Sequence, residues 1–385
     1  MANLQSLEIF AGCGGWALGV ATAGFQHAMI VESDPRACAT LTANKKRGVK
    51  HFADWRVEQV DIRDVDFLPW RGRIALVSGG PPCQPFSIGG NHKGPSDKRN
   101  MWPEALRAVE EVRPRAFVFE NVRGLLRPAF SDYLKYLCLQ LSWPEIHVRG
   151  HGWRDTLRKL RQLEKSGKQP DYRVVVRGIN AADYGSAQKR HRAIFMGIRA
   201  DVADEVVFPS PTHSRESLVW EQRISESYWK RHCLLSRLRS RISRLEKQIL
   251  TRLRTSDTKP SERPWKTVRD IIGDLPRPVS SFEKIVNHRL HPGARSYAGH
   301  TGSFWDEPAK ALKAGDHGVP GGENIVVSQS GRVRYFTIRE MARLQGMPDD
   351  FAIDETWQSS IRQLGNAVPV EVGLSFGKSI LNQIS

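Results

Sequence analysis

A cysteine in a stiff turn and a glutamate in a later segment are the residues best suited to covalent chemistry. Cys83 lies in SGGPPCQPFS (78–87), where three prolines fix the backbone and remove amide donors. Glu120 lies in FVFENVRG (117–124). A thiolate can attack an electron-poor carbon, and a nearby carboxyl group can hold or transfer a proton. Because each follows an apolar run typical of a buried strand, we expect both groups on neighbouring strand ends.

A glycine-rich turn and two acidic residues indicate a cofactor site. LEIFAGCGGWALGV (7–20) predicts a strand that turns into a helix, and the turn fits GxGxx[GA]. Glu32 ends the next apolar run twenty residues after Gly12, where a carboxylate can accept ribose hydroxyls. Asp61 and Ile62 follow a third run and suit the edge and face of an adenine. These features indicate an adenosine-containing cofactor and leave NAD and S-adenosylmethionine open.

The elements that must position these residues alternate along the chain. Strands are expected at 7–10, 28–31, 57–60, 73–79, 115–121, 172–180 and 192–199, with a helix over 100–112. Strands that alternate with helices predict an α/β fold built on a parallel sheet.

The composition favours a nucleic-acid partner. The chain has 385 residues, a net charge of +17 and a pI of about 9.9. Such an excess predicts a polyanionic partner, although a merely basic surface gives the same composition. The five cysteines are dispersed and none pairs as CxxC, so we expect reduced thiols and no metal site. We see no signal peptide and no run long enough to span a membrane, so a cytoplasmic protein is expected.

Near residue 200 the alternation of strand and helix patterns ends, and proline-rich and basic segments follow. A proline-rich linker (208–214) precedes a basic helix candidate over 231–254, which has eight Lys and Arg and one Glu. This helix could pack on its own domain with a solvated basic face, or lie along DNA phosphates. A glycine-rich loop (313–322) follows, and the pattern is helical again over 334–346. A glycine turn within 364–380 leads into a terminal helix.

Six motifs together identify a family. FAGCGG (10–15), PPCQPFS (81–87), ENV (120–122), QKRHR (188–192), REMARLQGMP (339–348) and GNAVPV (365–370) occur in that order. The chain resembles the cytosine-C5 DNA methyltransferases of bacterial modification systems over residues 5–200 and 334–385.

The resemblance implies a Rossmann-like S-adenosylmethionine-dependent core with a smaller target-recognition domain. The expected domains are 1–200 for catalysis and cofactor binding, and 201–333 for target recognition with a basic helical insertion at about 215–256. Residues 334–385 would return to the catalytic domain. Cys13 departs from the larger apolar residue that many relatives have there.

The resemblance also implies the catalytic roles. Cys83 matches the nucleophile that adds to carbon 6 of a flipped-out cytosine, and Glu120 matches the acid at N3. Arg192 matches the residue that contacts the cytosine, and Arg190 a supporting position. Carbon 5 then attacks the methyl group of S-adenosylmethionine. The base that removes the carbon 5 proton stays unassigned, and bound water is one candidate.

The remaining implied residues bind the cofactor or double-stranded DNA. The cofactor set is Phe10, Gly12, Gly14, Gly15, Trp16, Glu32, Ser33, Asp61, Ile62, Pro82, Met101 and Asn366, with Trp102 as an alternative to Met101. The DNA set is Gln84, Ser87, Gln188, Lys313 and His317, and Arg295, His300 and Arg332 are further candidates for base readout. The loop 87–100 is glycine-rich and basic, which suits closure over DNA. We expect a monomer.

Three alternatives remain at this point. A tRNA cytosine-C5 methyltransferase would share the motifs, but the long basic region 200–333 favours a DNA-reading domain. A non-catalytic DNA-binding regulator would not need Cys83, Glu120 and Arg192 intact. An NAD oxidoreductase would leave Cys83 and QKRHR without a role. The target DNA sequence cannot be deduced, because the side chains that reach the groove are unknown.

Overall fold

The chain folds into two compact units that interleave along the sequence. The computed structural model describes residues 4–82, 100–147, 152–234, 242–256, 258–280, 285–296, 301–314, 324–328 and 330–385. The first unit comprises Met1–Ile179, His191–Pro209 and Gly373–Ser385, and the second comprises Asn180–Arg190 and Ser210–Val372. Residues 334–372 thus group with the second unit, whereas the sequence assigned 334–385 to the catalytic domain. The division into catalytic and target-recognition domains stays a prediction.

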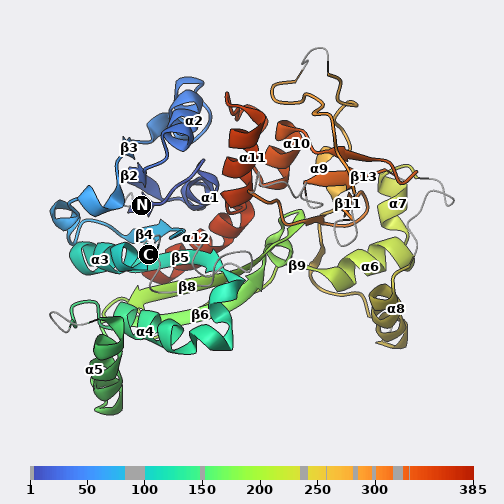
Figure 1. Ribbon diagram of the computed structural model, residues 1–385. Helices are drawn as coiled ribbons and strands as arrows, with labels where there is room; N and C mark the ends of the chain where they lie inside the picture. The colour runs from blue at the N-terminus through green and yellow to red at the C-terminus, as the bar shows by residue number, and fades with distance from the viewer. Residues whose placement is uncertain are drawn as a thin grey trace. The chain divides into compact units, whose positions relative to one another are not determined.

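A seven-stranded sheet forms the centre of the first unit (Figure 1), with strand order β3-β2-β1-β4-β5-β8-β6. Its strands are β1 (Gln5–Ile9), β2 (Gln26–Glu32), β3 (Val57–Gln59), β4 (Leu76–Gly79), β5 (Ala116–Val122), β6 (Tyr172–Asn180) and β8 (His191–Arg199). All seven expected strands are present, and the α/β fold is confirmed. Strands β1 to β5 pair in parallel, whereas β8 runs antiparallel to β5. Strand β8 is also the neighbour of β6 in the sheet. Only ten residues connect the two strands, which is too few for the helical crossover that a parallel pair requires, so the chain reverses direction between them.

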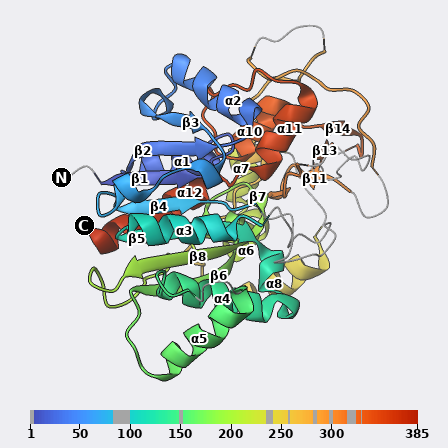
Figure 2. The same cartoon turned by 60° about the vertical axis from the view of Figure 1, so that its left-hand side comes forward.

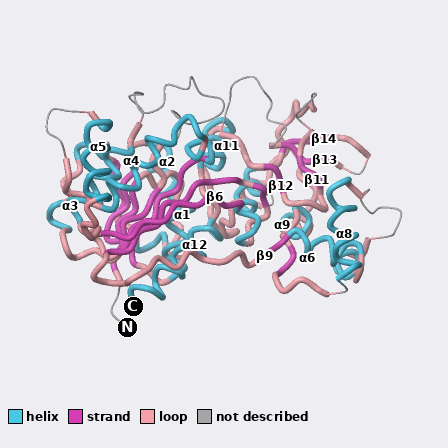
Figure 3. The backbone as a smooth tube through the Cα atoms, turned by 90° about the horizontal axis from the view of Figure 1, so that it is seen from below, coloured by secondary structure: helices cyan, strands magenta, loops and turns pink. Residues whose placement is uncertain are grey.

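Different helices cover the two faces of this sheet. Helices α3 (Trp102–Val112) and α4 (Ser131–Ser142) pack on one face over a core that includes Phe117 and Phe119. Figure 2 shows α3 running along the strands, and Figure 3 shows α4 and α12 (Val370–Ile384) on opposite sides of the sheet. Helix α12 packs against α1 (Gly15–Ala23) so closely that a Cβ at Gly373 would lie 2.7 Å from the Trp16 carbonyl oxygen. The backbone approach therefore requires glycine at this position.

Two further helices lie at the edges of the first unit: α2 (Pro35–Lys46) and α5 (Trp153–Lys165). Helix α2 follows β2 directly, and its first turn is capped by Asp34, whose side chain accepts from the Arg36 amide. Helix α5 packs its apolar side on α4 through Leu157 and Leu160.

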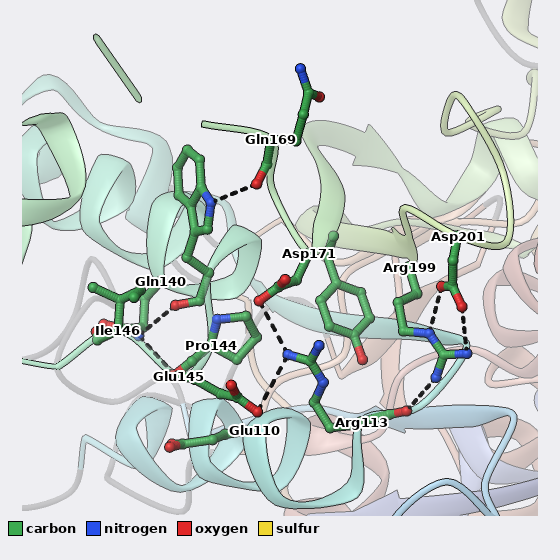
Figure 4. A network of polar contacts seen from close by, with 12 residues as sticks. Glu110, Arg113, Gln140, Pro144, Glu145, Ile146, Gln169, Asp171, Arg199 and Asp201 are labelled. Atoms are coloured by element: carbon green, nitrogen blue, oxygen red, sulfur yellow. Dashed lines mark hydrogen bonds and ion pairs between the residues drawn. The ribbon is translucent and has the colours of Figure 1, made fainter. Parts of the chain in front are cut away.

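A network of ion pairs and hydrogen bonds lies at the N-terminal end of β5 (Figure 4). Arg113 lies between Asp171 and Glu145, with N–O distances of 3.1 and 3.8 Å. Arg199 donates to the Arg113 carbonyl at 2.8 Å and pairs with Asp201 at 2.7 Å. The register pairs Ala116 with Ile198 at this end and Val122 with Arg192 at the other. The network thus fixes the end of β5 and β8 that lies opposite Glu120.

The second unit is built from short elements. Its helices are α6 (Arg215–Arg223), α7 (Ser227–Arg231), α8 (Arg244–Ser256), α9 (Val268–Ile272), α10 (Ile338–Leu344) and α11 (Trp357–Asn366). Its strands are β7 (Gln188–Lys189), β9 (His213–Ser214), β10 (Arg263–Pro264), β11 (Ser303–Phe304), β12 (Ala309–Lys310), β13 (Ile325–Val327) and β14 (Val333–Tyr335). Buried side chains supply many of the hydrogen bonds that longer strands would provide. Arg339, for example, donates to the carbonyls of Val286, Pro348 and Phe351.

Two helix predictions in this unit need correction. The single helix over 231–254 is wrong, because α7 ends at Arg231 and α8 begins at Arg244. Between them Cys233 has a φ of 52°, a left-handed conformation that ends a helical run. The helix expected from residue 334 begins at Ile338, where Thr337 and Glu340 form a capping box. No helix in the described part of the chain is long and apolar enough to cross a membrane.

Candidate active site

A cavity of about 450 Å³ lies in the first unit, beyond the carboxyl ends of β1, β2 and β3. Its lining residues are Phe10, Val31, Glu32, Ser33, Val60, Asp61, Ile62, Arg63, Pro82 and Met101. Seven of these residues belong to the predicted cofactor set. Val31, Val60 and Arg63 were missed, although Val31 and Val60 directly precede predicted residues. Parallel strands that end at one edge of the sheet bring these loops together.

Backbone amides hold the Glu32 carboxylate at the cavity. One carboxylate oxygen accepts from the Gly12 amide at 2.7 Å. The other accepts from the amides of Ser33 and Asp34 at 2.9 and 2.8 Å. A carboxylate has about four acceptor sites, so the group retains capacity for a ligand hydroxyl. The predicted turn motif and acid are therefore one hydrogen-bonded structure.

A second carboxylate, that of Asp61, is held by Arg63. The Arg63 guanidinium donates to both carboxylate oxygens, at 2.9 and 2.5 Å, and the Arg63 amide donates at 3.0 Å. The hydrogen bond from the Arg63 side chain lowers the pKa of Asp61 to about 2. Asp61 is therefore an ionised acceptor at neutral pH. With Phe10 and Ile62 as apolar walls, the cavity combines flat apolar surface with two acceptors, which fits an adenosine.

Some predicted cofactor residues lie elsewhere in this unit. Gly12 contributes its amide, whereas Gly14 and Gly15 form the turn into α1 and do not line the cavity. Trp16 is also absent from the lining: its ring is buried and stacks on Phe376 with centroids 6.3 Å apart. Its role at the cofactor stays a prediction.

Met101 and Trp102 were alternatives for one wall of the cavity. Met101 lines it. Trp102 is fully buried and packs edge-on against Phe195 and Phe119 in the core.

Glu120 and Arg192 form an ion pair at the end of β5 and the start of β8. Arg192 pairs in register with Val122, two residues beyond Glu120, so both side chains project from the same face. The Arg192 Nε contacts a Glu120 carboxylate oxygen, and its Nη1 donates to the His191 carbonyl at 2.8 Å. The side chains are 16% and 11% exposed, which leaves this mostly desolvated pair within reach of a ligand.

The segment that leads to Cys83 is anchored beside this pair. A Cβ on Gly80 would lie 3.3 Å from the second Glu120 carboxylate oxygen, so the chain passes close to that group. The Asn121 side-chain amide donates to the Pro81 carbonyl at 3.0 Å and is fully buried. Asn121 was missed as a site residue although it lies in the quoted ENV motif. Cys83, Gln84 and Ser87 lie outside the described residues, as do His300 and His317.

Comparison with known proteins decides the family. The C-5 cytosine-specific DNA methylase family matches residues 4–382 of the chain. The chain belongs to this family. The methylase is 28% identical to the type II methyltransferase M.PspPI of Psychrobacter, over 98% of this chain and 79% of that protein. It is also 28% identical to M.NgoMIV of Neisseria gonorrhoeae, over 99% and 98% of the two chains.

Solved structures agree on the fold. The DNMT2 of Spodoptera frugiperda superposes with a TM-score of 0.57 at 13% identity, covering 98% of this chain and 100% of that one. The Dnmt2 methyltransferase of S. pombe gives 0.56 at 16% identity, over 98% of each chain. The family match gives the activity of the methylase as DNA cytosine-C5 methylation. The tRNA and non-catalytic alternatives are not favoured.

Arg190 and Gln188 of the QKRHR motif are buried inside the second unit of the methylase. Arg190 donates to the carbonyls of Leu312 and Gly365 at 3.0 and 2.8 Å. Gln188 donates to the Leu344 carbonyl at 3.0 Å and to the side chain of Gln345 at 2.9 Å. Arg190 therefore acts in this structure as a positioning residue. The assignment of Gln188 to DNA contact gains no support from its position.

The other predicted residues of the second unit are exposed. They are Arg295, Lys313, Arg332 and Asn366. Asn324 holds the backbone of Lys313 on both sides, accepting from its amide at 2.9 Å and donating to its carbonyl at 3.0 Å. Asn366 is the last residue of α11. Their roles in DNA or cofactor binding stay predictions.

Proposed function

We propose that the methylase transfers a methyl group from S-adenosylmethionine to carbon 5 of a cytosine rotated out of double-stranded DNA, through a covalent bond between Cys83 and carbon 6. The supporting observation is the Glu120–Arg192 pair beside the anchored Gly80–Pro81 segment. Pro82, the residue before Cys83, lines the cofactor cavity. The residues that directly precede the proposed nucleophile thus lie next to the Glu120 carboxyl group and the cofactor cavity.

Each protein group has a defined task in this reaction. The Cys83 thiolate forms a bond to carbon 6, which makes carbon 5 nucleophilic. Glu120 holds a proton at N3 and Arg192 offsets negative charge on the ring. Bound S-adenosylmethionine supplies the electrophilic methyl group. After transfer, loss of the carbon 5 proton to a base such as water and elimination of Cys83 restore the aromatic ring.

The cavity residues would hold the cofactor by complementary chemistry. Glu32 would accept from the ribose hydroxyls, and Asp61 from the adenine amino group. Phe10 and Ile62 would pack on the adenine ring. The fit rests on two ionised or amide-bound acceptors and two apolar walls in one cavity.

The cytosine would have to be rotated out of the duplex. In the stack, neighbouring bases cover both faces of its ring, so neither the thiol nor the methyl donor could approach it. Extrusion costs a few kcal/mol, by order of magnitude. Residues 201–333 would select the DNA site, and a single chain would suffice for the reaction. The type II relatives support a role in a restriction-modification system.

A duplex with 5-fluorocytosine at the target tests the covalent step. Fluorine on carbon 5 cannot leave as a proton, so Cys83 would stay bonded after methyl transfer. We expect a denaturation-resistant complex whose modified peptide, identified by mass spectrometry, contains Cys83. Methylated DNA from natural duplex without any trapped complex would contradict the covalent route. Binding without transfer of label from tritiated S-adenosylmethionine would instead support a regulator.

A further inference from the structure

The positive charge of the methylase is unevenly distributed. Residues 151–300 carry 31 Lys and Arg and 16 Asp and Glu, and so hold fifteen of the seventeen net positive charges. The segment 230–259 is the most uneven, with ten basic residues and two acidic ones. Part of this segment is α8, which belongs to the second unit.

Helix α8 uses one face for packing. Ile249, Leu250 and Leu253 form a cluster with Val219 of α6, and Figure 1 shows the two helices side by side. This contact confirms that the helix packs on its own unit, which was one of the two interpretations of the basic segment.

The acidic residue of α8 lies on the packed side as well. Glu246 is 7% exposed, pairs with Arg223 at 3.4 Å and accepts from the Ser243 amide at 2.6 Å. Its charge is therefore offset inside the unit. Because the acid is buried, the opposite face of the helix carries cations without acids.

The exposed cations lie together on that opposite face. Arg244, Lys247, Arg252 and Arg254 are all exposed. At 100° per residue they fall within one half of the helix surface, and from 244 to 254 they span about 15 Å. Arg252 pairs with Glu216 at 3.1 Å. Among the described residues, no acidic group lies within ion-pair distance of Arg244, Lys247 or Arg254.

We infer that this face of α8 binds the phosphates of duplex DNA independently of base sequence. The inference rests on the DNA substrate of the proposed function and adds a binding surface to it. The three unpaired cations lie along about 15 Å of helix axis. One DNA strand presents about four phosphates over that length, since they recur every 3.4 Å of axis. The face has Gln248, Thr251 and Thr255 between its cations and no apolar residue at its centre. It therefore suits a polyanion better than an apolar partner.

Salt dependence of DNA binding tests the inference. The variant R244Q/K247Q/R254Q removes the unpaired cations, and a random-sequence duplex serves as the probe. Each lost phosphate contact lowers the slope of log affinity against log salt by about 0.9, so we expect the slope to fall by about 2 to 3. The ratio of affinities for target-containing and random duplex should stay constant, because phosphate contacts carry no sequence information.

The control variant is R158Q/K159Q/K165Q on α5, which removes the same charge from another exposed helix. We expect it to keep the wild-type slope. An unchanged slope in the α8 variant, or equal losses in both, would overturn the inference. Preferred binding of the α8 face to anionic phospholipid vesicles over duplex DNA would also overturn it.

Two features keep the test decisive. If the triple variant fails to unfold cooperatively on heating, R254Q alone should still lower the slope by about 0.9. The assay needs no methyl transfer, so a failed 5-fluorocytosine trap would count against the proposed chemistry and leave the α8 result valid.

Discussion

Two arginines of one motif, only two residues apart, serve different regions of the methylase. Arg190 lies in the second unit, where the residue is 1% exposed and its guanidinium donates to backbone carbonyls. Arg192 lies in the first unit, where it pairs with Glu120 at the ends of two strands. The same side chain thus supports the fold in one region and remains open to a ligand in the other.

The difference follows from how each unit provides hydrogen-bond partners for its buried backbone carbonyls. Strands of up to nine residues in the first unit pair most of their carbonyls with amides of neighbouring strands, so fewer carbonyls depend on side chains. The second unit has strands of two or three residues, and its buried carbonyls accept from Arg190, Arg339 and Gln345 instead. Of the two arginines, we therefore expect Arg192 to affect the chemistry and Arg190 to affect the stability.

The largest expected effect is the loss of chemistry without loss of fold. Cys83→Ser should lower methyl transfer by at least about a thousandfold, because a hydroxyl is a much weaker nucleophile than a thiolate. Transfer of tritium from S-adenosylmethionine to DNA measures the rate, and a gel shift measures the retained DNA binding. Turnover close to that of the wild type would refute the covalent mechanism.

Matched variants of the two arginines test the comparison directly. Arg190→Lys should lower the free energy of unfolding by about 2–4 kcal/mol, because one ammonium cannot reproduce the forked contacts to two buried carbonyls. Arg192→Lys should lower the methyl-transfer rate about ten- to a hundredfold and change stability less. Urea unfolding and single-turnover kinetics of both variants give the four numbers. Equal stability losses would remove the distinction between the units.

Glu8 departs from this contrast, because it is a buried polar group of the first unit that we expect to affect stability. Burial raises its pKa to about 8, and it accepts from the Ser78 hydroxyl on the neighbouring strand. An acid with a raised folded-state pKa stabilises fully below its unfolded pKa and loses this contribution as pH rises through the folded value. Stability of Glu8→Gln relative to wild type should therefore rise by up to about 1.4 kcal/mol per pH unit between pH 5 and 8. Denaturant unfolding across this range measures it, and a flat difference would mean that Glu8 is not protonated in the fold.

The smallest effect is expected at the cofactor cavity. Asp61→Asn should weaken S-adenosylmethionine binding about tenfold, because it replaces an ionised acceptor with a neutral one. The KM for DNA and the unfolding midpoint should not move. Because the pKa of Asp61 is about 2, its contribution to binding should be constant above pH 4 and lost only as pH falls toward 2. Calorimetric titration at several pH values tests this, and a midpoint near neutral pH would contradict the assignment.

Most of the first unit could be predicted because its signals are local. Apolar runs located all seven strands, and strand ends located Phe10, Glu32, Asp61 and Glu120. The clamp on Asp61 by Arg63 was not predictable, since the sequence shows their spacing but not the rotamer that brings them together. The second unit was predicted less well because few of its elements are long enough to show a period.

Sequence patterns alone were enough to predict the α/β sheet, the family, the cofactor loop and the residues suited to covalent chemistry. These depend on short motifs and on strand ends that meet at one edge of a parallel sheet. The three-dimensional packing was needed to show that Trp16 lies in the core, that Arg190 supports the fold, and that α8 turns its acid inward and its cations outward. The partners of Arg190 lie 122 and 175 residues away in the chain. Burial and hydrogen bonding between such distant segments are set by packing, and no local pattern records them.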